Sequence, residues 1–231
     1  MKRKAKGIGL AIVGAGRVGL FRGEVAARHP AVEWIGIAER NPNRGADVAG
    51  RIGADFVTTD HRELLRRSEV TAALISTDEH LHVEPILAAV ERGVPMLIEK
   101  PLATDLAQSA RVLEAIEAAG LDAVVGYTQR FRRKWLGAKE KVRTGALGDV
   151  TLVTSRAFMN RLVAIDNYKR TDDPSSISPM VISGTHVSLG LSTQAATAAE
   201  AHNRLMLTKA LDLSARRKQP VRLPLASEVL R

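Results

Sequence analysis

Short apolar runs alternate with amphipathic segments along the first 128 residues of the chain. The runs are short for helices and rich in branched side chains, which is typical of buried parallel strands. They are Ile8–Val13, Val32–Ala38, Phe56–Thr59, Thr71–Ser76, Val94–Ile98 and Asp122–Tyr127. This alternation predicts an α/β fold, a doubly wound and mainly parallel sheet that binds its ligand at the carboxyl ends of the strands.

The segments between these runs carry signals for the start and end of helices. Asp60 and Asp105 are predicted N-caps, and Gly93 and Gly120 are predicted to close helices. The expected helices are one that starts near Arg17, one over Arg44–Ile52, one that carries Leu64 and Leu65, one over His80–Arg92, and one from Asp105 through Ala119.

The first apolar run leads directly into the glycine motif G-A-G-R-V-G. Gly14 permits a tight turn, Gly16 lets a pyrophosphate approach the backbone, and Gly19 lets the following helix pack close to the strand. Arg17 and Val18 begin that helix, whose free N–H groups and dipole favour an anion. The motif predicts dinucleotide binding. The alternative is an ordinary glycine turn between a strand and a helix.

The second apolar run ends at Glu39, where a dinucleotide site needs a carboxylate for the ribose hydroxyls. Such a carboxylate favours NAD, because it repels the 2′-phosphate of NADP. Arg40 is the next residue, and its guanidinium could turn toward that phosphate. We therefore expect NAD as the cofactor, with use of NADP as the alternative.

The pattern changes after residue 128. A basic amphipathic helix is expected over Phe131–Thr144, a longer strand over Val150–Phe158, and a loop over Asn160–Pro179. A helix-forming run follows over Ala195–Arg217, and Pro220–Pro224 is an extended tail. The sequence thus predicts a dinucleotide-binding domain over 1–128 and a reduced α+β C-terminal appendage over 129–231.

Composition narrows the possible partners. The chain has 231 residues, 45% of them hydrophobic, so it can bury a full core. The net charge of +9 is compatible with a nucleic-acid partner. However, only 3% of the residues are aromatic, and no nucleic-acid-binding motif accompanies the charge. These two observations favour an ordinary solvated basic surface. No cysteine is available for a disulfide or a metal site. No apolar stretch reaches membrane-spanning length, so we expect a cytoplasmic protein without a membrane partner.

Candidate chemistry lies directly after the fifth apolar run, in the segment Glu99-Lys100-Pro101. A lysine at the carboxyl end of a strand lies where this architecture exposes its ligand groups, and in a partly desolvated pocket it can act as an acid, a base or a hydrogen-bond donor. The alternative is a solvated surface lysine.

The order of these motifs resembles the glucose-fructose oxidoreductase and inositol dehydrogenase family, often called Gfo/Idh/MocA. The resemblance rests on the glycine motif, Glu39, Ser76-Thr77, the run from Glu99 to Ala103, and the run from Gly126 to Phe131. It implies NAD(P)-dependent hydride transfer on a sugar, cyclitol or related small molecule. It also implies that Lys100 lies near the reacting oxygen, as the first catalytic candidate.

The same resemblance implies further cofactor-binding candidates. Ser76 and Thr77 match a segment beneath the nicotinamide end of the cofactor, and Glu99 accompanies the lysine. His82 matches a histidine of the following helix, although it shares a helical face with apolar residues and a core histidine is the alternative. Gln129 and Arg130 match the segment after the sixth strand, with a solvated charge as the alternative for Arg130.

The C-terminal half departs from the family pattern. His186 resembles the histidine of the family's D-x-x-x-H pattern, which implies a second catalytic residue here. Ile182 stands where that pattern has an aspartate that orients the histidine. Beyond His186, a short link leads to a segment from Leu205 to Ala215 that resembles the family's own ending, so the substrate domain resembles an internally truncated one. The implied function is an NAD(P)-dependent oxidoreductase without a metal ion, and it is a possible homo-oligomer. The first alternative is a dinucleotide-binding sensor or partner subunit without turnover. The second, which ranks lower, is a nucleic-acid-associated protein.

Overall fold

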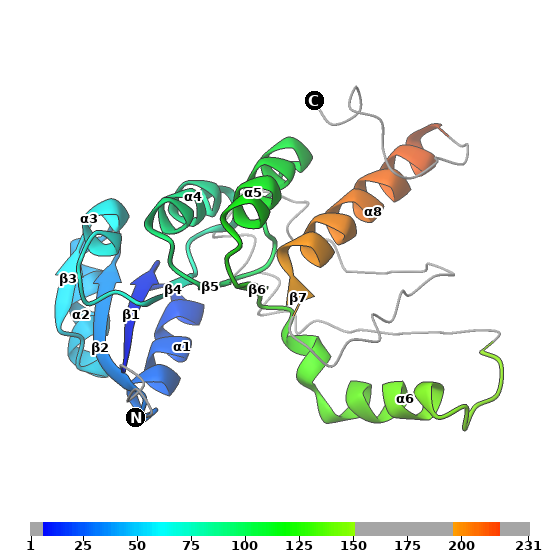
Figure 1. The fold of residues 1–231 in the computed structure, drawn as a ribbon, viewed down its shortest axis with the longest axis horizontal. Helices are drawn as coiled ribbons and strands as arrows, with labels where there is room; N and C mark the ends of the chain where they lie inside the picture. The colour runs from blue at the N-terminus through cyan, green and yellow to red at the C-terminus, as the bar shows by residue number, and fades with distance from the viewer. Residues whose placement is uncertain (1–6, 151–195, 218–231) are drawn as a thin grey trace. The chain divides into compact units, whose positions relative to one another are not determined.

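The computed structural model describes residues 7–150 and 196–217 of the chain (Figure 1). The chain divides into two compact units, one formed by residues 1–128 with 194–231 and the other by residues 129–193. The described part of the first unit contains the sheet and most of the helices.

The sheet of the first unit has seven strands in the order β3-β2-β1-β4-β5-β6-β7. The first six are parallel, and β7 runs antiparallel to β6. Their bounds are β1 Ile8–Val13, β2 Val32–Ala38, β3 Phe56–Thr58, β4 Ala72–Ile75, β5 Met96–Ile98, β6 Ala123–Val125 and β7 Ala196–Thr197. The predicted doubly wound, mainly parallel sheet is confirmed, and the six strands predicted between residues 8 and 127 are all present.

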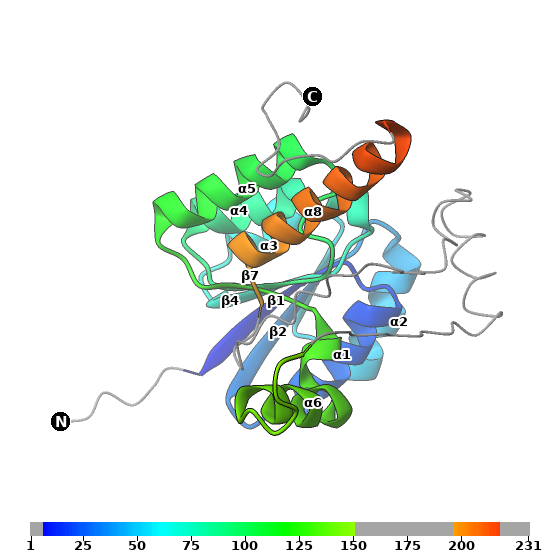
Figure 2. The ribbon, with the colours of Figure 1, turned by 90° about the vertical axis from the view of Figure 1, so that its right-hand side faces the viewer.

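Alternate residues of the strands enter two separate apolar cores. Ile12 of β1 packs with Ile37 and Leu74 on the face that α1 and α2 cover, whereas Ala11 and Val13 belong to the core on the other face. Figure 2 shows α1 and α2 on one side of the sheet and α3, α4, α5 and α8 on the other. Burial on both faces explains why the strands are almost continuously apolar rather than alternating in polarity.

The helices follow the predicted caps closely. Asp60 and Asp105 accept hydrogen bonds from backbone N–H groups of the first turns of α3 and α5, and Gly93 and Gly120 end α4 and α5 in the left-handed conformation. The bounds in the first unit are α1 Arg17–Ala27, α2 Pro42–Ile52, α3 His61–Leu65, the 3-10 helix η1 Glu79–Leu81, α4 Val83–Arg92, α5 Leu106–Ala119 and α8 Ala198–Arg217.

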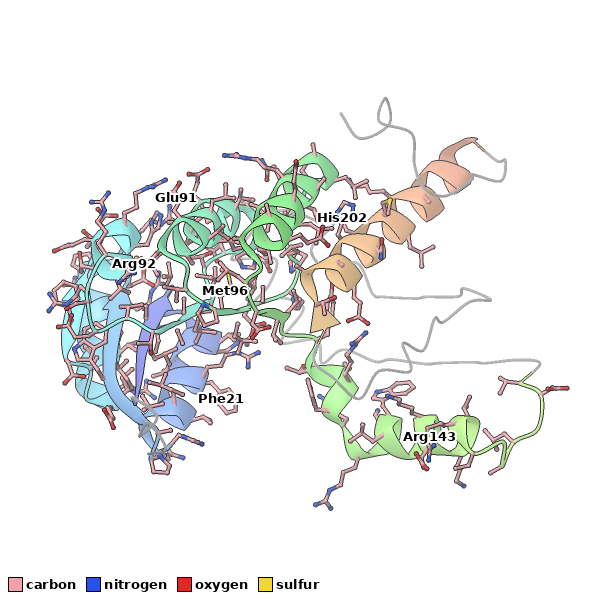
Figure 3. The ribbon with its side chains drawn as sticks, viewed as in Figure 1. Phe21, Glu91, Arg92, Met96, Arg143 and His202 are labelled. Atoms are coloured by element: carbon pink, nitrogen blue, oxygen red, sulfur yellow. The ribbon has the colours of Figure 1, made fainter. Side chains whose placement is uncertain are left out.

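The C-terminal segment differs from the predicted domain division. Residues 196–217 were expected in a second domain over 129–231, but β7 pairs with the edge strand β6 and α8 packs on α5. Ala198 and Ala210 of α8 are buried, and His202 Nδ1 lies 3.0 Å from the hydroxyl of Ser109 in α5 (Figure 3). The physical reason is that β6 leaves an open hydrogen-bonding edge, which β7 covers.

The second unit is described over residues 129–150. It begins in the 3-10 helix η2, Thr128–Phe131, and continues as α6, Arg133–Arg143, in agreement with the helix predicted over 131–144. Gly145 and Gly148 follow with positive φ angles. The strand expected over 150–158 lies outside the described residues from position 151 onward, as do the loop over 160–179 and the tail over 220–224. None of the described helices is long and apolar enough to cross a membrane.

Candidate active site

The predicted site residues of the first unit gather at the carboxyl ends of the strands. The strand order reverses between β1 and β4, whose following helices α1 and α4 lie on opposite faces of the sheet (Figure 2). In open α/β sheets, ligands bind outside the carboxyl ends of the strands at such a switch point. The glycine motif follows β1, Ser76 follows β4, and Glu99 follows β5.

The three glycines of the motif serve different physical ends. Gly14 has a φ of +91°, and a Cβ there would lie 2.6 Å from the Thr77 nitrogen. A Cβ on Gly19 would lie 2.0 Å from the Gly14 carbonyl oxygen, so α1 can pack against the loop only without a side chain at this position. A Cβ on Gly16 would meet nothing within 4 Å. The fold therefore does not require glycine at position 16, and the open space beside it suits the close approach of a ligand.

Helix α1 begins directly at this open space. Gly16 is its N-cap and offers no side-chain cap, and the first turn contains no acidic residue. Arg17 and Val18, the first two helical residues, are exposed. The first backbone N–H groups of a helix have no partner within the helix, and together with the dipole they favour an anion at this end.

Glu39 is held beside the glycine loop by three hydrogen bonds. Its Oε2 accepts from the Ala15 N–H at 2.8 Å, and its Oε1 accepts from the Asn41 N–H at 3.0 Å and from Arg44 Nη2 at 2.7 Å. Burial by itself raises the pKa of Glu39, but the hydrogen bonds from Arg44 and from the two backbone N–H groups lower it below its usual range. The group is thus an ionised acceptor, which is the form that binds a ribose diol.

Arg44 was not singled out in the sequence, although it lies next to the predicted carboxylate. It sits in the first turn of α2, where its backbone N–H donates to the cap residue Asn41. This cap was the available signal, because Asn-Pro at the start of a helix places the first turn just after Glu39. Arg40 is exposed. The guanidinium that contacts the carboxylate is that of Arg44.

Ser76 supports the glycine loop with its side chain. The residue is 8% exposed, and its hydroxyl donates to the Gly14 carbonyl at 2.7 Å. This hydroxyl is therefore used within the protein, and Ser76 can reach a cofactor mainly through its backbone. Thr77 is half-buried, and its hydroxyl donates to the Asp78 carbonyl at 3.3 Å.

The segment Glu99-Lys100-Pro101 follows β5 directly. The Glu99 N–H donates to the Ile75 carbonyl at 2.8 Å, which aligns this segment with the end of β4. Lys100 is exposed, and its peptide bond to Pro101 is cis. Arg22 of α1 pairs with the Glu99 carboxylate through Nε and Nη2. Arg22 was also missed in the sequence, since the two residues are 77 positions apart and no local pattern joins them.

His82 has its ring buried inside the protein, which favours the core-histidine alternative over direct cofactor binding. Its side chain is fully buried, with Nδ1 2.7 Å from the Pro101 carbonyl oxygen and Nε2 3.2 Å from the Thr77 carbonyl oxygen. Burial lowers the pKa of His82, although the two carbonyls oppose this effect. A neutral imidazole donates one hydrogen bond, and the shorter contact assigns that proton to Nδ1.

The other predicted site residues belong to the second unit or lie outside the described residues. Gln129 and Arg130 belong to η2 and to the second unit. His186 and Ile182 lie outside the described residues. Among residues 7–150 and 196–217, no group of three or more histidine, aspartate or glutamate side chains could hold a metal ion.

Comparison with known proteins assigns the first unit to a described family. The profile of GFO_IDH_MocA, "Oxidoreductase family, NAD-binding Rossmann fold", matches residues 8–127, more than half of the chain. These residues include the glycine motif, Glu39, Ser76, Lys100 and the sheet from β1 through β6.

Individual relatives are similar over the same region. Inositol 2-dehydrogenase 4 of Saccharopolyspora erythraea is 34% identical over 139 residues, which are 59% of this chain and 41% of the relative. A levoglucosan dehydrogenase, solved with NADH and levoglucosan, is 28% identical with a TM-score of 0.54, over 62% of this chain and 40% of that one. Scyllo-inositol dehydrogenase from Lactobacillus casei, solved with NAD(H) and scyllo-inositol, has a TM-score of 0.60 over 64% of this chain and 44% of that one. At 24% identity it shows the fold alone. The chain thus spans less than half the length of these relatives.

Proposed function

Since the chain belongs to the oxidoreductase family with an NAD-binding Rossmann fold, we propose that it transfers a hydride between NAD(H) and a cyclitol, a sugar or a related polyol or keto compound. Two of the relatives named above are an inositol dehydrogenase and a levoglucosan dehydrogenase. Their substrates come to this chain as a proposal, because the similarity covers the cofactor-binding half of each relative.

The observation that carries the proposal is the arrangement around the glycine loop. Gly16 borders open space at the start of α1, and Glu39 is fixed by the Ala15 N–H of the same loop. The residues present fit a dinucleotide. The N-terminus of α1 would hold the pyrophosphate, and the Glu39 carboxylate would accept hydrogen bonds from the hydroxyls of the adenosine ribose. When bound, the nicotinamide supplies the hydride acceptor or donor.

Lys100 is the proposed acid–base group of the reaction. In the oxidising direction, the neutral Nζ of Lys100 would accept the proton of the substrate hydroxyl. The hydride would leave the carbon that bears this hydroxyl and pass to the nicotinamide. In the reducing direction, the ammonium form would return that proton to the carbonyl oxygen. Its exposed position directly after β5, at the edge where the strands end, supports this role. His186 is proposed as its partner, on the family resemblance alone.

A second candidate function is dinucleotide binding without turnover, as a sensor or as a partner subunit. One observation favours it. Ile182 stands where the family has an aspartate, and its apolar side chain cannot orient His186 as a carboxylate would. Both functions share the same cofactor site and differ in the fate of the substrate.

Binding and turnover measurements on wild type and Lys100→Ala separate these functions. We expect calorimetry to detect NADH binding to both proteins with similar affinity. A screen of polyols, cyclitols and keto-sugars with NAD(H) and NADP(H) should detect turnover in wild type, and Lys100→Ala should lower it by about 10²- to 10⁴-fold, the usual contribution of one acid–base group. Lys134→Ala, at an exposed position of α6, is the control.

The outcomes have distinct meanings. Turnover that survives Lys100→Ala contradicts the proposed role of this residue. Tight NADH binding with no turnover on any substrate favours the non-catalytic candidate. A wild-type protein that binds neither NADH nor NADPH contradicts both functions.

A further inference from the structure

Two polar side chains from other elements hold the residues on either side of Lys100. On one side, Arg22 of α1 pairs with Glu99, and both side chains are largely buried, at 21% and 13% exposed. Gly126, just after β6, lies against this pair: a Cβ there would be 2.9 Å from Arg22 Nη2 and 3.0 Å from Glu99 Oε1. The ion pair therefore lies where α1 and the ends of β5 and β6 meet.

On the other side, His82 holds the carbonyl of Pro101. Its fully buried ring lies between this carbonyl and that of Thr77, which follows β4. The contact at Nδ1 is the shorter of the two, at 2.7 Å, so the imidazole donates to the backbone directly after Lys100. The ring thus links the backbone after Lys100 to the segment after β4, whereas the ion pair links the residue before Lys100 to α1.

Apolar anchors complete the arrangement. Ile98 before the segment and Leu102 and Ala103 after it are buried, whereas Lys100 itself is exposed. The backbone is therefore held in place on both sides of Lys100, whereas the side chain of Lys100 is exposed. This matters because lysine is flexible, and a catalytic group displaced by about 1 Å can lose about 10² in rate.

We propose that Arg22 and His82 are positioning residues that fix the backbone of Lys100 for acid–base chemistry. The inference rests on the proposed function, in which Lys100 exchanges a proton with the substrate. Neither residue contacts the reacting atoms: Arg22 acts through the Glu99 carboxylate, and His82 acts through the Pro101 carbonyl.

The first test needs no substrate. Amide hydrogen exchange of residues 99–103 is measured by mass spectrometry in Arg22→Met and His82→Leu, and we expect it to be about tenfold faster or more than in wild type. Arg51→Met is the matched control, because it removes a surface ion pair between Arg51 and Glu24 of the same helix α1. His82→Gln keeps an N–H donor and should restore much of the protection. Unchanged exchange in both Arg22→Met and His82→Leu would overturn the proposal.

The second test asks whether Arg22 acts through Lys100. Arg22→Met should lower kcat by about 10- to 100-fold and leave the Kd for NADH within about twofold. In a Lys100→Ala background the same substitution should cost nothing further, because there is no catalytic lysine left to position. An equal fractional loss in both backgrounds would overturn the proposal. Arg22→Lys keeps the charge but not the forked geometry, and it serves in both tests if Arg22→Met does not fold.

The two tests separate the inference from the proposed function. If wild type turns over no substrate, the proposed function fails, and the exchange measurement still decides whether Arg22 and His82 hold the segment. If wild type turns over and the exchange is unchanged, the positioning role fails while the function stands.

Discussion

At the scale of single residues, Gly16 offers the sharpest test of cofactor binding. A Cβ at this position meets no atom of the protein within 4 Å, so Gly16→Val should leave the fold intact. The added side chain would occupy the space through which a pyrophosphate approaches the backbone. We expect the Kd for NADH to rise by at least about tenfold, or about 1.4 kcal/mol.

Calorimetry with Gly50→Val provides the matched control for that substitution. Gly50 lies in α2, and a Cβ there also meets nothing within 4 Å, but the position is remote from the glycine loop in sequence and element. NADH affinity that is equal in Gly16→Val and wild type would show that the cofactor does not approach the backbone at this position.

Glu39 and its neighbouring guanidinium groups should decide the choice between NAD and NADP. The carboxylate repels a 2′-phosphate, and Arg44 is already paired with it at 2.7 Å. Glu39→Gln removes the repulsion and releases Arg44, so the ratio of the NADPH Kd to the NADH Kd should fall by about tenfold. Glu24→Gln, in another arginine pair, is the control. A ratio that does not change would exclude Glu39 as the selecting residue.

At the scale of elements, α8 is attached to the first unit through α5 and the edge of the sheet. His202 contacts the hydroxyl of the fully buried Ser109, and β7 pairs with β6 next to it. His202→Ala leaves that hydroxyl without this partner, at a cost of about 1 kcal/mol. Amide exchange should therefore accelerate in residues 196–217 before it does in β1 or β4.

Asn203→Ala provides the comparison within the same helix, because Asn203 is exposed. It should leave the exchange of residues 196–217 unchanged. An equal effect of both substitutions would mean that the His202 contact contributes nothing specific to the docking of α8.

At the scale of the whole molecule, one buried and two partly buried histidines should make stability depend on pH. Burial lowers the pKa of His61, His82 and His202. The unfolded chain then binds protons that the folded chain does not as the pH falls through the ordinary histidine value of about 6.5. The free energy of unfolding should therefore decrease between pH 7.5 and 5.5, and each kcal/mol lost should lower Tm by about 2–4 °C.

Thermal unfolding of His82→Gln checks the origin of this dependence. The variant lacks one of the three histidines, so its Tm should fall less than that of wild type over the same pH range. His80→Gln, at an exposed position of η1, is the control. A pH dependence identical in wild type and His82→Gln would contradict the contribution of His82.

The sequence by itself determined the features whose physical cause is local. Branched apolar runs, the N-caps Asp60 and Asp105, and the closing glycines Gly93 and Gly120 each act within a few residues, and the structure confirms the elements they predicted. The alternation of strands and helices then led to the parallel sheet, because right-handed crossovers leave few other arrangements.

Only the tertiary structure decided which side chains meet across the fold. Arg22 contacts Glu99, which is 77 positions away in the sequence. His82 contacts Pro101 at a separation of 19 positions, and Ser76 contacts Gly14 at a separation of 62. The structure also places residues 196–217 in the first unit, where β7 pairs with the edge strand β6, and not in the predicted second domain. The reason is that such contacts depend on the order and direction of the strands, which bring together segments that share no local pattern.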